Sequence, residues 1–195
     1  MAVLTKDEFY HNKLHLIKRI REGELLIHPT DTIYGIGCNA ANKEAVKKLR
    51  EIKQRPEEKP LSVIAPSKEW IRQNCMVDEE VESWLDKLPG PYTLILKLKN
   101  QDAVAENVTG GKESIGVRMP DHWFTQITEE IARPIITTSV NIRGQTFMTS
   151  LDDVDDSIRN RIPIILYEGE KHGTPSTIVN LSGEEIESVG YRKII

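Results

Sequence analysis

Residues 24–40 read ELLIHPTDTIYGIGCNA, and this stretch decides the fold class. Its first five residues, ELLIH, contain three consecutive apolar residues and predict a short buried strand. Residues 29–40 are rich in hydroxyl groups and glycine and are expected to form a loop. Asn42 then caps a predicted helix whose apolar residues recur at helical spacing. A strand, a polar loop and an amphipathic helix in this order are typical of an α/β protein.

The same alternation of elements extends on both sides of this stretch. Residues 5–8 form a capping box that starts a helix, in which Leu14, Ile17 and Ile20 share one face and which ends before Gly23. Further strands are expected at 61–65, 92–98, 114–119, 135–138, 164–167, 177–181 and 186–189, and further helices after the cap Ser67, around 81–88, at 123–132 and at 152–160. Strands and helices alternate early and strands crowd late. We therefore expect one twisted mixed parallel/antiparallel sheet with flanking helices.

Length and composition limit the classes of protein that this chain can be. Its 195 residues predict a single domain over 1–195. With 26 basic and 30 acidic residues the net charge is −4, which excludes binding of nucleic acid by bulk positive charge but allows a local basic pocket. The two cysteines cannot form a disulfide framework or a four-cysteine zinc site. Without a visible signal peptide or an apolar run of membrane-spanning length, we expect a cytoplasmic protein with no membrane association.

Residues 35–40 read GIGCNA and formally match the G-x-G-x-x-A fingerprint of dinucleotide-binding proteins. The glycines do not follow the strand directly, because six residues intervene. About 20 residues further on, Lys53 and Arg55 stand where a ribose-binding acid is expected. A glycine turn needed for tight backbone geometry is the favoured interpretation.

Lys53, Arg55 and Lys59 place three cations within seven residues, next to a proline that ends the preceding helix. Such a run is often a solvated basic face, or a set of cations that complements the negative end of the helix dipole. The alternative is a polyphosphate clamp, because a guanidinium fork and compact ammonium groups suit phosphate oxygens.

Residues 137–144, TTSVNIRG, place small hydroxyl groups and an asparagine directly after an apolar strand. This placement suits a ligand site at the carboxyl end of a strand. A turn in which serine and asparagine satisfy their own backbone explains it equally well. No Walker A loop, nucleophile elbow or convincing metal-ligand spacing is present in the sequence.

Taken together and in order, these segments resemble the YrdC family, whose members include threonylcarbamoyl-AMP synthases. The resembling blocks are PTDTIYG at 29–35, KQRPEEKPL at 53–61, PGPYT at 89–93, GVRMPDH at 116–122, TSVN at 138–141 with Gly144, and PSTIV at 175–179. Each block is weak alone, but six blocks in the family's order are specific. The resemblance implies a single domain with the YrdC-like fold.

The resemblance also implies an activity and its site residues. L-Threonine, bicarbonate and ATP would give threonylcarbamoyl-AMP and diphosphate, for the threonylcarbamoyl modification of adenosine 37 in tRNA. The implied catalytic residues are Lys53, Arg55, Ser139 and Asn141. The implied ATP-binding residues are Arg55, Lys59, Ser114, Asn141, Thr149 and Arg192. The implied threonine-binding residues are Thr32, Arg118, Ser139 and Ser176.

The resemblance names partners as well. Mg²⁺ is the expected cofactor, held through substrate phosphates and water instead of by protein ligands. Expected partners, beyond the three substrates, are tRNA threonylcarbamoyl-transferase proteins, with a possible direct contact to tRNA or double-stranded RNA. Two departures stand out. Val140 and Arg143 replace the usual alanine and second serine of the family's Ser-Ala-Asn-x-Ser-Gly stretch, and Arg192 lies in an incomplete form of the usual ending.

Two other functions fit the same resemblance. One is a YciO-like paralogue with the same fold but altered or lost synthase activity. The presence of both Lys-x-Arg and Ser-x-Asn disfavours it. The other is a double-stranded RNA-binding module without synthase activity, which the net negative charge disfavours.

Overall fold

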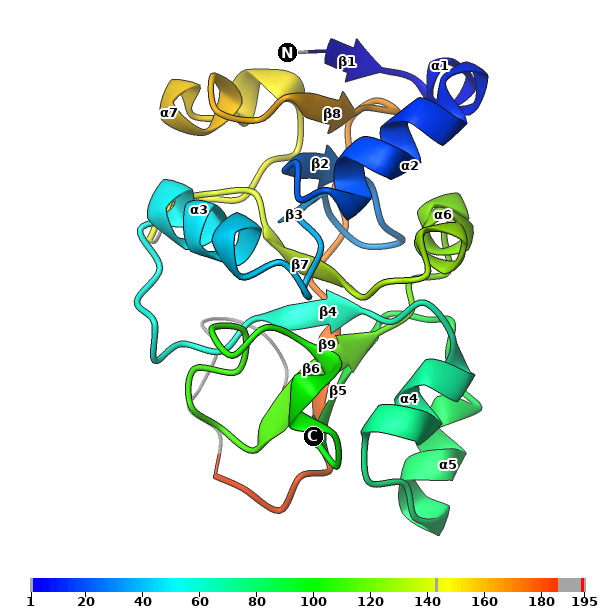
Figure 1. Cartoon of the computed structure of the whole chain (residues 1–195). Coiled ribbons are helices and arrows are strands. Elements are labelled where there is room, and N and C mark those ends of the chain that lie inside the picture. Colours follow the sequence, from blue (N-terminus) through cyan, green and yellow to red (C-terminus); the bar gives the residue numbers. More distant parts are fainter. Residues whose placement is uncertain (1, 143, 186–193, 195) are drawn as a thin grey trace.

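The computed structural model describes residues 2–142, 144–185 and 194. Its strands form one nine-stranded sheet in the order β1-β8-β2-β3-β7-β4-β6-β5-β9, of which the part from β1 to β4 runs from top to bottom in Figure 1. The strands are β1 (Ala2–Leu4), β2 (Leu26–His28), β3 (Gly35–Gly37), β4 (Ser62–Ile64), β5 (Tyr92–Lys97), β6 (Ser114–Arg118), β7 (Ile135–Ser139), β8 (Ile164–Leu166) and β9 (Thr177–Asn180). The sheet contains both parallel and antiparallel pairs, so the predicted mixed sheet is confirmed.

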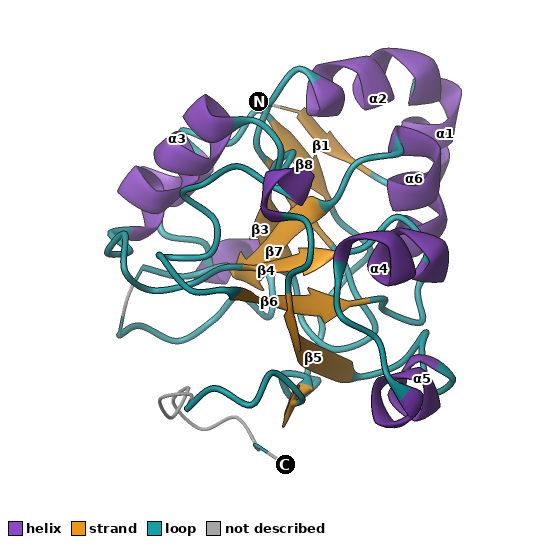
Figure 2. Cartoon of the chain, turned by 60° about the horizontal axis from the view of Figure 1, so that its bottom comes forward, coloured by secondary structure: helices purple, strands orange, loops and turns teal. Residues whose placement is uncertain are grey.

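Helices flank the sheet on both sides. They are α1 (Lys6–His11), α2 (Lys13–Arg21), α3 (Lys43–Lys53), α4 (Lys68–Asn74), α5 (Glu79–Leu85), α6 (Trp123–Ile131) and α7 (Asp156–Arg159), with 3₁₀ turns at Gln101–Ala103 and Leu151–Asp153. In Figures 1 and 2, α3 lies on one side, and α1, α2 and α6 lie on the other. None of the helices in the described part of the chain has the length and apolar character needed to cross a membrane.

Side-chain caps begin the helices where the sequence predicts. Thr5 Oγ1 accepts a hydrogen bond from Glu8 N, while Glu8 Oε2 accepts one from Thr5 N at 2.8 Å. Asn42 Oδ1 accepts from Ala45 N at 3.0 Å and begins α3. Ser67 caps α4 in the same way. These caps satisfy backbone donors that a helix start otherwise leaves unpaired.

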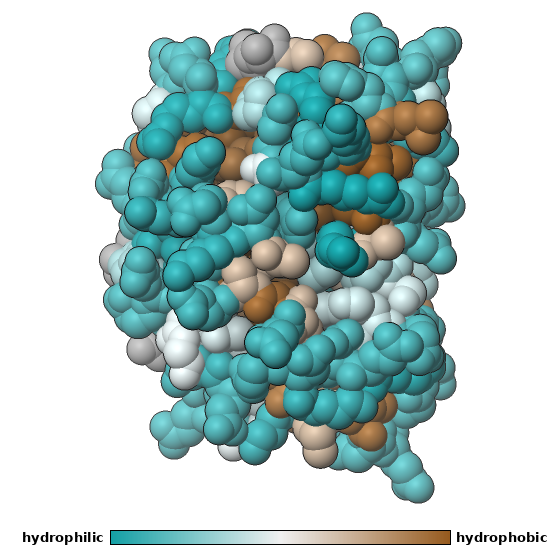
Figure 3. Space-filling view, viewed as in Figure 1, coloured by the Kyte–Doolittle hydropathy of each residue, from teal (hydrophilic) through white to brown (hydrophobic). Residues whose placement is uncertain are grey.

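The core divides between the two faces of the sheet because successive strand residues point in opposite directions. Leu26, Ile64 and Ile135 pack with the apolar residues of α1, α2 and α6. Their chain neighbours Ile27 and Val63 belong to the larger cluster on the other face, which includes the apolar side of α3. The surface in Figure 3 is mostly hydrophilic, and apolar residues emerge only in separate patches.

Two sequence predictions of secondary structure are wrong in detail, and one strand is missing from the predictions. The predicted loop over 29–40 contains the strand β3, which pairs with both β2 and β7. The predicted helix over 152–160 is a 3₁₀ turn followed by the shorter α7. The strand β1 was not predicted, and the predicted strand 186–189 lies outside the described residues.

The glycines of the G-x-G-x-x-A segment therefore lie in a strand, not in a phosphate-binding turn. A Cβ atom on Gly37 would lie 1.8 Å from the carbonyl oxygen of Ile136 on the neighbouring strand β7. The close approach of the two backbones explains why residue 37 is a glycine. Because both glycines lie in a strand, the strand–turn–helix context that a dinucleotide site requires is absent here.

The first predicted helix is interrupted at Asn12, which ends α1 and precedes α2. All three residues predicted to share one apolar face lie in α2. Ile17 and Ile20 are buried as predicted, but Leu14 is 82% exposed. The prediction that Leu14 shares the buried face is wrong, because the buried face of α2 is formed by Leu16, Ile17 and Ile20, and Leu14, in the first turn, lies off it.

Alanine substitutions on α2 test this correction. Leu14→Ala is expected to leave the free energy of unfolding within about 0.5 kcal/mol of wild type, because an exposed side chain loses little packing. Ile17→Ala, on the same helix, is expected to cost about 2–5 kcal/mol, because Ile17 is only 5% exposed. Urea denaturation measures both, and equal losses would contradict the described orientation of α2.

Candidate active site

Lys53, Ser139 and Asn141 meet at one end of the sheet. Lys53 is the last residue of α3, Ser139 ends β7, and Asn141 lies in the turn that follows. The Lys53 ammonium donates to the carbonyl oxygen of Ser139, to the carbonyl oxygen of Asn141 at 2.9 Å and to Asn141 Oδ1 at 3.2 Å. Ser139 Oγ donates to the same Oδ1 at 2.6 Å. One buried cation thus holds the turn after β7.

The environment of Lys53 alters its ionisation. The residue is only 4% exposed, and this burial, with the positive charge of Arg55 as the second cause, lowers the pKa of Lys53 to about 7. Ammonium and free amine are then both populated near neutral pH. The three surrounding oxygen acceptors stabilise the ammonium form, because it has three N–H groups to donate.

Arg55 and Lys59 belong to a loop that turns away from α3. Gln54 adopts the left-handed conformation (φ 49°) and ends the helix, as the sequence around Pro56 predicts. Arg55 donates to the carbonyl oxygen of Pro60 at 2.6 Å and to that of Lys59 at 3.4 Å. Because Lys53 is buried and Arg55 is bound to its own loop, these cations are not a solvated helix face.

Arg50, which the sequence analysis did not select, holds this loop from beneath. The residue is 4% exposed, and its guanidinium donates to the carbonyl oxygens of Pro56 at 2.7 Å, Lys59 at 3.0 Å and Asn107 at 2.9 Å. Nothing in the local sequence distinguishes it from the other basic residues of α3. Only the tertiary contacts identify its role.

Arg118 and Thr32 form a second cluster, together with Asp31. Arg118 is 6% exposed, and its Nη2 donates to Asp31 Oδ1 at 2.7 Å and to Thr32 Oγ1 at 3.3 Å. Asp31 Oδ2 accepts from the backbone N of Asp121 at 3.1 Å. Arg118 Nε has no hydrogen-bond partner among the residues that the structure describes. A buried donor without an acceptor suits an anionic ligand group that is not part of the chain.

Backbone contacts fix the position of Thr32. Its N–H donates to Thr30 Oγ1 at 3.1 Å, and Thr30 Oγ1 donates to the carbonyl oxygen of Ile33 at 2.7 Å. The carbonyl oxygen of Thr32 lies directly against Gly173, where an added Cβ atom would be 2.0 Å away. The residue is therefore held by its own loop and by a distant segment.

That distant segment, residues 167–176, connects β8 to β9. Figure 1 shows it in orange, running past the strands that lie between them in the sheet. It supplies Ser176, whose Oγ lies 2.8 Å from Thr93 Oγ1 in a buried pair. It also reaches Thr149, whose carbonyl oxygen accepts from Lys171 N at 3.0 Å.

Glu168 lies at the start of segment 167–176 and receives three side-chain hydrogen bonds. The donors are Lys171 Nζ at 2.6 Å, His122 Nε2 at 2.9 Å and Trp123 Nε1 at 2.9 Å. Burial alone would raise the pKa of Glu168, but these hydrogen bonds outweigh it and lower the pKa to about 2. The carboxylate is charged at any physiological pH.

A pH titration of stability tests this environment of Glu168. A carboxylate with a lowered pKa stabilises the fold above its unfolded pKa of about 4.3, and this contribution is lost as the pH falls toward the folded value. The difference in unfolding free energy between wild type and Glu168→Gln is expected to narrow from about pH 5 to about pH 3. A constant difference over this range, measured by urea denaturation, would show that Glu168 is not held as described.

The remaining predicted residues are more dispersed. Ser62 pairs with both Thr137 and Gly116, so Ser139 and Ser114 lie at the same end of the sheet. With β4 between them, their backbones are about 10 Å apart. Ser114 Oγ donates to Glu184 Oε2 at 2.9 Å, and Thr149 Oγ1 donates to Asp153 Oδ2 at 2.5 Å. Arg192 and Arg143 lie outside the described residues.

The structure thus brings together Lys53, Ser139 and Asn141, and separately Thr32 and Arg118. Arg55 and Lys59 share a loop anchored beside the first group. Sequence reasoning missed Asp31, Thr93 and Glu168 as partners of these residues. Asp31 and Thr93 lie inside blocks that carry the family resemblance, which is a signal that could have found them.

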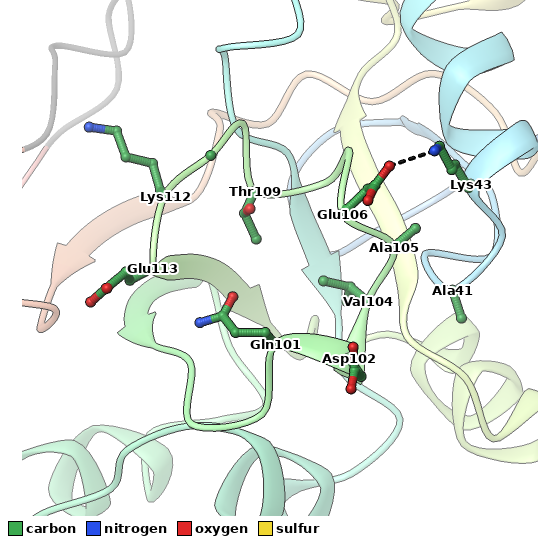
Figure 4. Close-up of a pocket in the computed structure, with 11 residues that line it drawn as sticks. Ala41, Lys43, Gln101, Asp102, Val104, Ala105, Glu106, Thr109, Lys112 and Glu113 are labelled. Carbon is green, nitrogen blue, oxygen red and sulfur yellow. Dashed lines mark ion pairs between the residues drawn. The ribbon is translucent and has the colours of Figure 1, made fainter.

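A hollow of about 670 Å³ lies elsewhere on the surface and is drawn in Figure 4. An ion pair between Lys43 and Glu106 crosses its edge, and Lys112 and Glu113 lie at its other side. None of the predicted substrate residues lines it. Within the described ranges no group of three histidine, cysteine, aspartate or glutamate residues could hold a metal ion.

The fold and these clusters define a class of α/β proteins in which a mixed sheet carries a polar site with buried cations. Comparison with known proteins is more specific. The Sua5/YciO/YrdC family model, described as telomere recombination, matches residues 18–190. The chain therefore belongs to the Sua5/YciO/YrdC family, and the resemblance noted in the sequence is confirmed.

Individual relatives agree with this assignment. A putative threonylcarbamoyl-AMP synthase of Methanocaldococcus jannaschii is 38% identical, over 89% of this chain and 82% of the relative. A threonylcarbamoyl-AMP synthase of Vibrio campbellii is 34% identical, over 88% and 95%. Among solved structures, P. abyssi Sua5 complexed with L-threonine superposes with a TM-score of 0.82 at 33% identity, covering 93% of this chain and 54% of that one. E. coli YciO, at 22% identity and a TM-score of 0.75, over 87% and 84%, shows the same fold.

Proposed function

We propose that this protein is an L-threonylcarbamoyladenylate synthase and hence a nucleotidyltransferase. The amine of L-threonine and bicarbonate give N-carboxythreonine and water. A carbamate oxygen then attacks the α-phosphorus of ATP. The new P–O bond forms as the bond between the α-phosphorus and its bridging oxygen to the β-phosphate breaks, and diphosphate leaves. The observation that carries the proposal is the placement of two cation sites, Lys53 with Arg55 and the buried Arg118, in a chain whose relatives bear this name.

The Arg118 cluster suits the amino-acid substrate. Arg118 Nε is a buried donor that lacks an acceptor in the described part of the chain, and a carboxylate of L-threonine would supply one. Thr32 Oγ1, adjacent to the same guanidinium, can pair with the substrate's hydroxyl group and so disfavour analogues that lack it. Two serines are proposed to bind L-threonine as well. Ser176 would contact it from segment 167–176, and Ser139 would contact it from the end of β7.

The other cation site suits ATP. Adenylyl transfer needs in-line positioning and positive charge where negative charge develops, and it needs little covalent help from the protein. Arg55, Lys59 and Asn141 are proposed to bind the phosphates, with Lys53 fixing the turn that carries Ser139 and Asn141. Ser114 and Thr149 are proposed to bind the remainder of the nucleotide. Arg192 is proposed to bind it too, on the family resemblance alone. Mg²⁺ is proposed to bind through phosphate oxygens and water.

The product would pass to tRNA threonylcarbamoyl-transferase proteins. Because those proteins act on tRNA, a cytoplasmic location is proposed. The YciO-like alternative is not favoured, because the likeness to YciO supports the fold alone whereas synthases match at 34–38% identity. No contact in the described residues favours the alternative of an RNA-binding module without synthase activity.

Diphosphate release from ATP, with L-threonine and bicarbonate each omitted in turn, tests the proposal. Release that depends on both is expected. Release that ignores L-threonine would overturn the synthase assignment. L-Serine is a useful comparison substrate, because it keeps the hydroxyl group and lacks only the methyl group.

A further inference from the structure

Segment 167–176 contacts two proposed substrate residues from distant parts of the chain, Thr32 and Thr149, and itself supplies a third, Ser176. Gly173 lies against the carbonyl oxygen of Thr32, Lys171 N donates to the carbonyl oxygen of Thr149, and Ser176 pairs with Thr93. The segment contains no helix or strand before β9 begins at Thr177. Its position over the site must therefore come from side-chain and loop contacts.

Those contacts concentrate at the first residues of the segment. The Glu168 carboxylate accepts from His122, Trp123 and Lys171, as described above. Its backbone N donates to the hydroxyl group of Tyr34 at 3.0 Å, and that hydroxyl group donates to the carbonyl oxygen of Gly169 at 2.6 Å. Glu168 is therefore bound at once to the start of α6, to the loop that carries Thr32, and to its own segment.

The two ring nitrogens of His122 have separate tasks in this arrangement. His122 Nδ1 accepts from Phe124 N at 3.2 Å and caps α6. The proton of the neutral ring is then on Nε2, which donates to Glu168. Burial lowers the pKa of His122, so the neutral ring that serves both bonds is the form favoured at neutral pH. Nothing in these contacts touches a substrate position directly.

We propose that Glu168 is a positioning residue for the L-threonine site, an inference that rests on the proposed function. It anchors segment 167–176 and thereby places Ser176 and supports Thr32. All three side-chain partners of the carboxylate are donors. A glutamine amide has only one accepting oxygen and a donating nitrogen, so it cannot accept all three hydrogen bonds in the same geometry. Loss of the carboxylate removes these three bonds from the anchored end, while the backbone contacts with Tyr34 and every proposed substrate-binding side chain remain.

Glu168→Gln tests the inference, with Glu170→Gln as a matched control. Glu170 lies in the same segment, but its side chain is 65% exposed and pairs only with the exposed His172 in the described structure. Glu168→Gln is expected to raise the KM for L-threonine about tenfold or more, because a small misplacement of a positioned group is costly. The KM for ATP is expected to change less, and Glu170→Gln is expected to match wild type. Equal rises in both KM values, or an unchanged KM for L-threonine, would overturn the inference.

Amide hydrogen exchange gives a readout that does not depend on activity. Residues 169–176 are expected to exchange faster in Glu168→Gln than in wild type or Glu170→Gln, while exchange in α3 and β7 stays unchanged. Unchanged exchange over 169–176 would overturn the anchoring. If wild type shows no threonine-dependent diphosphate release, the proposed function fails instead, and the exchange result still decides whether Glu168 holds the segment.

Discussion

Arg55→Ala is expected to fold like wild type and to lose threonine-dependent diphosphate release by about 10²–10³-fold in kcat. The guanidinium contributes charge where the transferred phosphate becomes more negative, and this contribution is larger in the transition state than in the bound substrate. Its described hydrogen bonds are to carbonyl oxygens of its own loop, at Lys59 and Pro60. Arg50 holds the same loop independently, so removal of Arg55 leaves the loop supported.

Lys48→Ala is the matched control for this result. It removes an exposed cation from the same region, on α3, without touching the loop. Its kcat is expected to equal that of wild type. Circular dichroism and thermal unfolding establish that both variants are folded. A folded Arg55→Ala protein with a normal kcat would remove the phosphate-clamp role from Arg55.

Arg118→Lys is expected to raise the KM for L-threonine by about 10- to 100-fold. Lysine retains the positive charge but replaces the planar fork with a point charge, and it cannot reach Asp31, Thr32 and a substrate carboxylate in the same geometry. A hydrogen bond to a charged group is worth about 1.5–3 kcal/mol, and each 1.4 kcal/mol corresponds to a factor of ten in affinity. The KM for ATP is expected to stay near its wild-type value, because the described contacts of Arg118 are to Asp31 and Thr32.

Arg133→Lys provides the comparison, since it makes the same chemical change at an exposed arginine. Steady-state kinetics with each substrate varied in turn separates the two KM values. An Arg118→Lys protein with an unaltered KM for L-threonine would show that the carboxylate is bound elsewhere. The midpoint of thermal unfolding of Arg118→Lys is measured as well, because weakening a buried ion pair also destabilises the fold.

Much of the fold was predictable because its signals are local. Caps at Thr5, Asn42 and Ser67 begin helices through contacts three residues away, and the structure confirms each of them. The strands at β4 to β8 were predicted from short apolar runs. The strand β3 was not, because Gly35 and Gly37 have no strand propensity and are held there by the strands on either side.

The candidate site was only partly predictable, for a related reason. The motif around Lys53 and Arg55 indicates anion chemistry, since both side chains carry a positive charge wherever they lie. The motif does not indicate that Lys53 is buried and bonded to the turn at 139–141, or that Arg50 supports the loop. Those contacts join residues far apart along the chain, and no local pattern encodes them.

The sequence by itself determined the class of fold, the helix starts at the caps Thr5, Asn42 and Ser67, and the family, because periodicity, caps and ordered motifs depend on neighbouring residues. The tertiary structure alone decided that Leu14 faces solvent, that Gly37 lies in a strand and that Glu168 receives donors from α6. Exposure and hydrogen-bond partners depend on which distant segments pack together. Glu168 N reaches a hydroxyl group 134 residues away, and such a contact exists only once the sheet has formed.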